Sequence, residues 1–202
     1  GSIVKHASGI KGLVFVGESC AFPSRDPYSR GYWWNPQPGG KYLNGFWPVY
    51  DWPEWLSRVR DTTRRYNPGL EILFWSYNWN WAPEKDRINL LENIPTDVTL
   101  HVTYEMGNTL VETCGVPMRL DDYSITRQGP SDTFVSEAQV AARRGIKLTS
   151  MTNTAGMTWD YGVIPYMPVP YRWRDRYRTL RDSRTKFGLG GLMESHHYGF
   201  TP

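Results

Sequence analysis

The sequence is short of cysteine, of long apolar runs and of excess charge of one sign. Its two cysteines, Cys20 and Cys114, have no metal-site spacing, and a chain of 202 residues does not depend on a disulfide for its core. No apolar run approaches the ~20 residues needed to span a bilayer, so we expect no membrane partner. The net charge is only +3 and no Lys/Arg block is present, so we expect no nucleic-acid partner either.

The motifs of metal and phosphate chemistry are missing as well. The four histidines show no spacing such as His-Glu-x-x-His, so no catalytic metal is expected. Gly188, Gly190 and Gly191 lead into an apolar run instead of following one, which argues against a nucleotide-binding loop. We therefore expect no cofactor.

Aromatic residues, in contrast, are abundant. The chain has 10 Trp, 13 Tyr and 7 Phe, although its mean hydropathy is −0.55, so many rings must lie beside polar groups. Such surroundings suit a sugar, whose C–H face stacks on a ring while its hydroxyls take hydrogen bonds. An oligosaccharide is the expected partner.

Strand-like and helix-like segments alternate along the chain. This alternation predicts an α/β fold with a parallel sheet and helical crossovers, in a single domain over 1–202. Helices are predicted to begin near Asp51, Pro83 and Ser131, and a fourth, ending before Gly188, carries an arginine run that we expect to be a solvated face. The five apolar runs near strand length are 13–16, 72–75, 98–103, 146–149 and 189–193.

Five strands do not close a (β/α)8 barrel, which needs eight strands and about 250 residues. The chain is therefore interpreted as a portion of a larger barrel domain, with an open sheet as the alternative. Because an incomplete barrel exposes its edges, we expect homo-oligomerisation or association with the missing barrel segment. Long loops follow the strands at about 19–50, 104–130 and 150–170, where β/α folds place their sites.

Three glutamates come at or just after predicted strand ends: Glu18, Glu105 and Glu194. In a parallel sheet these carboxylates share one rim, and glycoside hydrolysis needs two carboxyl groups, one to protonate the leaving oxygen and one to act as nucleophile or base. We expect Glu18 to be the acid and Glu105 the second carboxylate. The alternative for each is a structural ion pair with one of the basic residues.

Further residues are candidates for sugar contact. The run 74–81 alternates rings with small polar groups, so Trp75, Tyr77, Trp79 and Trp81 share one face if the strand continues, and the alternative is that they pack in the core. His196 and His197 follow Glu194 directly and could orient a hydroxyl. The complete set of expected substrate contacts is Trp75, Tyr77, Asn78, Trp79, Trp81, Trp33, Trp34, Asp122, Asn153, His196 and His197.

The segments 12–18, 74–81 and 190–194 resemble the catalytic barrels of hexosaminidase-type glycoside hydrolases, those of family 20 and their relatives. In that family an Asp-Glu pair ends the fourth strand, and the Glu is the general acid. The resemblance implies that Glu18 is the acid and that the five strands are numbers four to eight of a barrel. Gly17 stands where the family has its Asp, so the implication does not extend to a substrate-assisted mechanism or to N-acetylated sugars.

The residues and the resemblance together predict a glycoside hydrolase catalytic domain, or a fragment of one, that acts on oligosaccharide through paired carboxylates. Two alternatives remain open at this point. One is a carbohydrate-binding protein without catalysis, and the other is a structural barrel half whose aromatics are core and interface.

Overall fold

The five predicted apolar runs form one parallel sheet in the computed structural model, which describes residues 2–7, 9–17, 31–32, 35–36, 51–111, 113–119, 129–153 and 170–195. The strands lie in sequence order, β1-β4-β5-β8-β9, and each pairs in parallel with its neighbours. Their bounds are β1 Gly12–Val16, β4 Glu71–Trp75, β5 Thr99–Thr103, β8 Leu148–Asn153 and β9 Leu189–Ser195.

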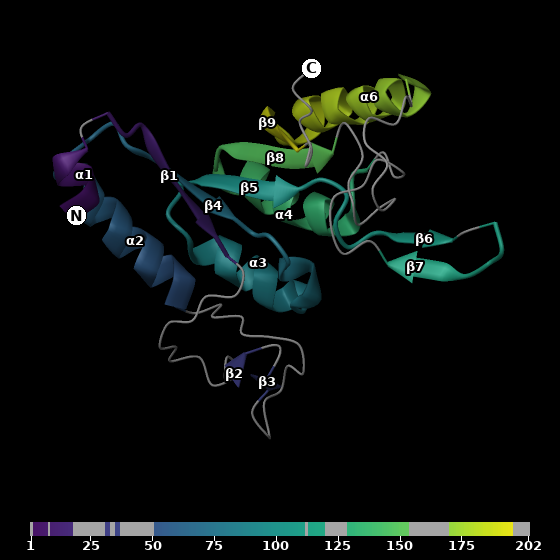
Figure 1. Ribbon diagram of the computed structural model, residues 1–202, viewed down its shortest axis with the longest axis horizontal. Coiled ribbons are helices and arrows are strands. Elements are labelled where there is room, and N and C mark those ends of the chain that lie inside the picture. Colours follow the sequence, from purple (N-terminus) through teal and green to yellow (C-terminus); the bar gives the residue numbers. More distant parts are fainter. Residues whose placement is uncertain are drawn as a thin grey trace, which may run out of the picture.

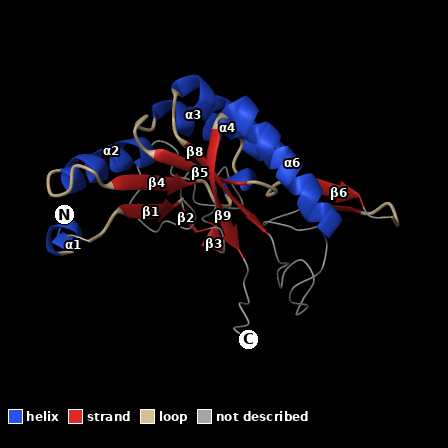
Figure 2. Cartoon of the chain, turned by 90° about the horizontal axis from the view of Figure 1, so that it is seen from above, coloured by secondary structure: helices blue, strands red, loops and turns tan. Residues whose placement is uncertain are grey.

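A helix connects each strand to the next, and these four helices lie along one face of the sheet (Figure 2). Sequential strand order with every crossover helix on one face is the arrangement of a β/α-barrel wall, so the expectation of a partial barrel-like α/β fold is confirmed. The helices are α2 Asp51–Arg64, α3 Glu84–Asn93, α4 Asp132–Arg144 and α6 Pro170–Phe187, and a short α1, Ser2–His6, precedes β1.

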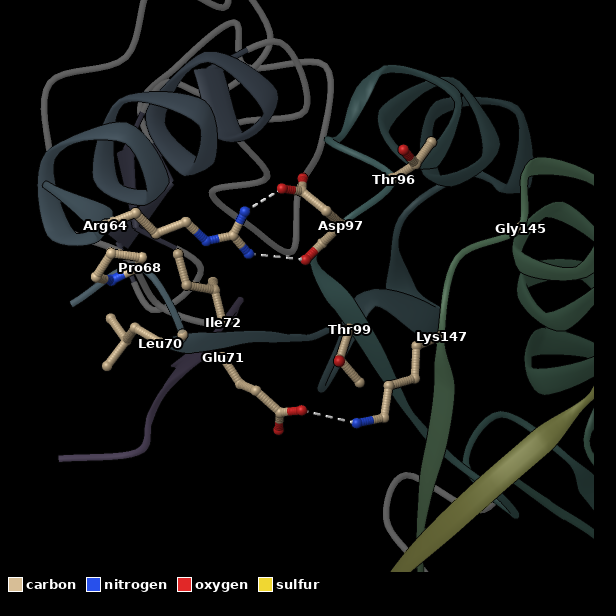
Figure 3. Close-up of a pocket in the computed structure, with 11 residues that line it drawn as sticks. Arg64, Pro68, Leu70, Glu71, Ile72, Thr96, Asp97, Thr99, Gly145 and Lys147 are labelled. Atoms are coloured by element: carbon tan, nitrogen blue, oxygen red, sulfur yellow. Dashed lines mark hydrogen bonds and ion pairs between the residues drawn. The ribbon is translucent and has the colours of Figure 1, made fainter.

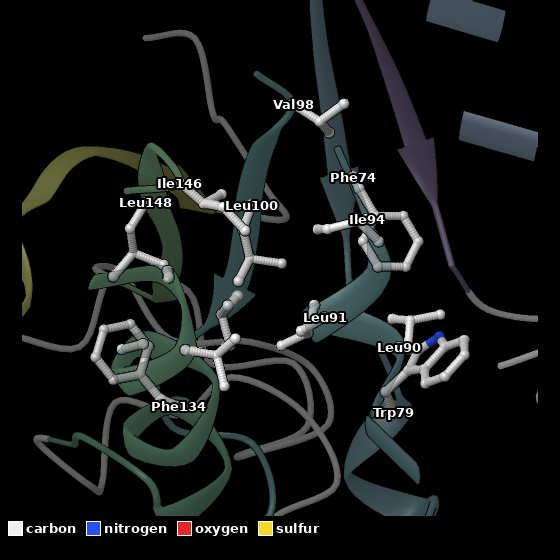
Figure 4. Close-up of a cluster of buried hydrophobic side chains, with 14 of the residues drawn as sticks. Phe74, Trp79, Leu90, Leu91, Ile94, Val98, Leu100, Phe134, Ile146 and Leu148 are labelled. Carbon is white, nitrogen blue, oxygen red and sulfur yellow. The ribbon is translucent and has the colours of Figure 1, made fainter. Parts of the chain in front are cut away.

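The core lies between the sheet and these helices (Figure 4). Phe74 and Leu100 project from the middle strands, and Leu91 and Phe134 meet them from α3 and α4; each is at most 1% exposed. Alternation places every second strand residue on this face and leaves the residues between them for the other face. That second face, opposite the connecting helices, is called the inner face below.

Helix α4 illustrates how local sequence sets these elements. The Ser131 hydroxyl accepts a hydrogen bond from the backbone N–H of Phe134 at 3.0 Å, which satisfies one free donor at the helix start. Gly145 ends the helix with φ 69°, a conformation that favours glycine. The start of the helix agrees with the prediction from sequence.

Links from helix to strand are short, whereas the connections from strand to helix are long. Two of the long connections contain small antiparallel pairs that periodicity did not predict, and one of them, β6–β7, extends away from the sheet (Figure 1). The bounds are β2 Gly31–Tyr32, β3 Asn35–Pro36, β6 Thr109–Val111 and β7 Pro117–Arg119. The chain therefore has one short-linked end of the sheet and one elaborated end, where the candidate site residues lie.

Candidate functional site

Glu105 follows β5 and is completely buried. Its carboxylate accepts a hydrogen bond from the Thr152 hydroxyl and pairs with the Arg176 guanidinium, whose Nε lies 3.4 Å from Oε1. Arg176 comes from α6 and is 1% exposed, so Glu105 points into the layer beneath that helix. This is the structural ion pair that the sequence offered as the alternative role for Glu105.

The same contact corrects the prediction for α6. Arg176 belongs to the arginine run expected to be solvated, yet it is buried together with Leu180, Ser183 and Phe187. The next residue, Tyr177, is instead 49% exposed. The buried carboxylate of Glu105 explains the difference, because it supplies the charge partner that a buried guanidinium requires.

Glu194 lies within β9 and is exposed. Its Oε1 accepts a hydrogen bond from the Tyr177 hydroxyl at 3.4 Å. The pKa of Tyr177 is raised, mainly by partial burial and also by the negative charge of Glu194. Glu194 pairs in register with Thr152, the residue whose hydroxyl binds Glu105. Two of the three predicted carboxylates are therefore neighbours through Thr152, on the face that α6 covers. The third, Glu18, lies outside the described residues.

The aromatic run after β4 does not continue as a strand. β4 ends at Trp75, a turn follows, and Asn78 adopts φ 62°, which brings the 3-10 helix Trp79–Trp81 back toward the core. Trp79 is fully buried, and its indole N–H donates to the Gly17 carbonyl at 3.0 Å. The prediction of four rings on one face is therefore wrong, and Trp79 is a core residue that offers no ring face to a ligand.

Trp75 and Tyr77 remain together as a pair outside the main core. Both rings are partly exposed, their centroids lie 4.9 Å apart at 48°, and Met151 packs against them. The indole N–H of Trp75 donates to the Thr103 hydroxyl at 3.2 Å, which holds the ring in one orientation. Two of the rings predicted to contact sugar are thus adjacent at the carboxyl ends of the middle strands.

His101 lies beside this pair and was not among the predicted site residues. It shares a register row with Trp75 and Thr149, and its ring meets the Trp75 ring edge-on at 5.2 Å. Burial lowers the pKa of His101 to about 4, so the imidazole is neutral at neutral pH. The alternation of Thr99, His101 and Thr103 with apolar neighbours was the available signal, because it marks a polar inner face.

The remaining predicted contacts are placed less fully. Asn153 is the last residue of β8, and Trp81 is the last residue of the 3-10 helix. The structure describes the backbone of both residues but not their side chains. Asn78 lies in the turn between Tyr77 and Trp79. The predicted contacts that lie wholly outside the described residues are Trp33, Trp34, Asp122, His196 and His197.

A pocket of about 290 Å³ lies at the opposite end of the sheet, where β4 and β5 begin (Figure 3). Its charged side chains are paired with one another: Arg64 with Asp97, and Lys147 with Glu71 at 3.0 Å. In β/α-barrel folds the amino ends of the strands serve stability, whereas binding occurs at the carboxyl ends. We therefore place the candidate site at the Trp75–Tyr77 pair and not in this pocket.

Within the described ranges, no three His, Cys, Asp or Glu side chains form a group that could hold a metal ion. No helix in that same part of the chain has both the length and the apolar character to cross a membrane. Compared with known proteins, the chain matches no family model, no curated protein and no solved structure. Its function is therefore argued from the site itself.

Proposed function

We propose that this chain is the carbohydrate-binding wall of a β/α barrel, with the sugar stacked on the Trp75–Tyr77 pair. The observation that carries the proposal is this pair of partly exposed rings, 4.9 Å apart, at the carboxyl ends of parallel strands. Rings of this kind offer an apolar face to the C–H groups of a sugar. The Thr103 hydroxyl and the His101 imidazole both contact Trp75.

The orientation of the glutamates favours binding over chemistry by Glu105. Its carboxylate is tied to Arg176 beneath α6, whereas Trp75 shares its register row with inner-face residues. A carboxylate enclosed beneath α6 by Arg176 and Thr152 does not reach the leaving oxygen of a sugar on the opposite face of the sheet. Glu105 therefore holds α6 against the sheet in this proposal, and the aromatic pair carries recognition.

The test titrates the full chain with cellotetraose, maltotetraose, xylotetraose and chitotetraose, followed by calorimetry and tryptophan fluorescence. Tyr77→Ala should weaken the tightest of these interactions about tenfold, since a stacked ring contributes roughly 1 kcal/mol beyond its buried area. Tyr66→Ala is the control, because Tyr66 is 51% exposed but lies after α2, away from the pair. No binding by any of the four sugars, or equal losses in both variants, would overturn the proposal.

Glycoside hydrolysis is the second candidate, with Glu18 as general acid. The observation that favours it is the hydrogen bond from the Gly17 N–H to the Trp75 carbonyl, at 2.7 Å. Gly17, the residue before Glu18, therefore lies beside the backbone of Trp75. A carboxylic acid following Gly17 could protonate the leaving oxygen of a glycoside. Glu194 lies on the face that α6 covers, so it is not the second carboxylate of this candidate.

This candidate is tested with aryl glycosides of the sugar that binds. Glu18→Gln should abolish release of the aryl group while binding is retained, since a neutral amide keeps the shape but donates no catalytic proton. Glu71→Gln is the matched control, because Glu71 is exposed at the other end of the sheet. Full turnover by Glu18→Gln would reject Glu18 as the general acid. No release of the aryl group by the original chain would reject hydrolysis and leave sugar binding standing.

A further inference from the structure

His101 occupies the centre of the sheet on its inner face. It lies in β5, the middle of five strands, and only 2% of the residue is exposed. Its neighbours in the register row are Trp75 on one side and Thr149 on the other. A buried polar side chain at such a position needs hydrogen-bond partners for both ring nitrogens.

The first ring nitrogen has a partner, and that partner determines the tautomer. Nδ1 lies 2.8 Å from the Thr149 hydroxyl, and the same hydroxyl lies 3.4 Å from the Leu100 carbonyl. We assign the hydroxyl proton of Thr149 to the Leu100 carbonyl, because a carbonyl oxygen only accepts. His101 then donates from Nδ1, and its Nε2 carries the free lone pair.

The second ring nitrogen has no partner among the described residues. Nε2 is buried and makes no hydrogen bond within the described part of the chain. Leaving a buried polar atom unsatisfied costs about 1–3 kcal/mol, and proteins retain such atoms where a ligand completes them. The neighbouring indole N–H of Trp75, by contrast, donates a hydrogen bond to the Thr103 hydroxyl.

We propose that His101 is a specificity-determining residue whose Nε2 accepts a hydrogen bond from a hydroxyl of the sugar stacked on Trp75. The inference rests on the proposed sugar-binding function. A neutral imidazole lone pair attracts a hydroxyl proton and repels an anionic oxygen, so the ligand class is an uncharged sugar rather than a uronate or a sugar phosphate. Because Nε2 is buried, a covering side chain has to move for the hydroxyl to reach it, and Met151, which packs against Trp75 and Tyr77, is flexible enough to do so.

Two substitutions separate the two ring nitrogens. His101→Asn keeps a donor near Nδ1 for Thr149 and removes the group at Nε2, whereas His101→Gln carries a polar group out to the position of Nε2. Calorimetry of the full chain with the four tetrasaccharides should show about tenfold weaker binding for His101→Asn and a loss of less than about threefold for His101→Gln. Equal affinity of His101→Asn and the original chain would overturn the inference, while a loss in Tyr77→Ala would still support sugar binding.

A second measurement uses the unsubstituted chain, so its result does not depend on whether the variants fold. Long-range ¹⁵N–¹H spectra of the histidine rings report which nitrogen carries the proton and whether the other accepts a hydrogen bond. We expect the Nδ1–H form of His101, with an Nε2 resonance that moves when the sugar is added. The Nε2–H form, or an Nε2 resonance that does not move on saturation, would refute the role of His101. Absence of binding by all four sugars would overturn this inference and the proposed function together.

Discussion

Acid should destabilise the protein through His101 before most carboxylates titrate. Burial lowers the pKa of this imidazole from 6.5 to about 4, so the unfolded chain binds a proton between these values and the folded chain does not. Stability from this residue is thus complete above pH 6.5 and falls as the pH is lowered toward 4. The loss is about 2 kcal/mol by pH 5 and about 3 kcal/mol below pH 4, because each pKa unit of difference corresponds to about 1.36 kcal/mol.

The assay is urea unfolding of the full chain and of His101→Asn, at half-unit steps from about pH 7.5 to pH 5. Other groups that titrate in this range contribute equally to both proteins and cancel in the difference. The free energy of unfolding of the original chain should fall about 2 kcal/mol more than that of the variant. An equal m-value in the two proteins would show that the denatured states are alike.

Parallel stability curves for the two proteins would refute the reasoning, since they would mean that the imidazole titrates alike in the folded and unfolded chain. A difference of the opposite sign would mean that His101 is charged in the folded state. In the second case the neutral acceptor role proposed for Nε2 would also fail, because an imidazolium has no lone pair to offer a hydroxyl.

Three further predictions concern stability and are read by urea unfolding. Gly17→Ala should cost about 1–3 kcal/mol because its new methyl group would lie 2.6 Å from a buried indole nitrogen, while Gly69→Ala, with its nearest atom at 3.8 Å, should cost less. Glu137→Leu should cost about 3–5 kcal/mol, since it leaves the buried Arg87 without the carboxylate that lies 2.8 Å from it, and adding Arg87→Met should recover part of the loss. Ser131→Ala should cost about 1 kcal/mol through loss of the cap of α4, and an unchanged midpoint would exclude that role.

The strands of the main sheet and the helices between them were predictable because they have local signals. The run 72–75 is apolar and rich in β-branched and aromatic residues, and α4 has a capping serine and a terminal glycine, so both elements lie where the pattern placed them. Parallel order followed from the alternation of elements, because a helical crossover returns the chain to the same strand direction. These features depend on neighbours in sequence.

The site was harder to predict because its contacts join distant segments. Arg176 was expected in solvent, and only the folded chain brings it to Glu105. Trp75 and Trp79 both lie in the run of alternating rings and small polar residues. The left-handed conformation of Asn78 nevertheless places Trp79 in the core. His101 did have a local signal, because polar and apolar residues alternate along β5. The segment 98–103 also resembles a continuous apolar run, which does not indicate a polar face.

The same remoteness explains the buried pair of Glu137 and Arg87. Burial raises the pKa of Glu137, and the Arg87 guanidinium and the Ser76 hydroxyl, which bind its two carboxylate oxygens, offset part of that effect. The three residues come from α4, α3 and the end of β4. No spacing in the sequence indicates that they meet.

The unequal connections at the two ends of the sheet also bear on how such a protein can be diversified. Helix α6 ends at Phe187 and β9 begins at Leu189, so almost any insertion there would disturb the core. Between Val16 and Asp51 the connection is much longer, and insertions in long connections cost little loop-closure entropy. Libraries randomised in the long connections should therefore yield new ligand preferences in a scaffold that still folds. Natural sequence changes should also be tolerated in these connections, at the carboxyl ends of the strands.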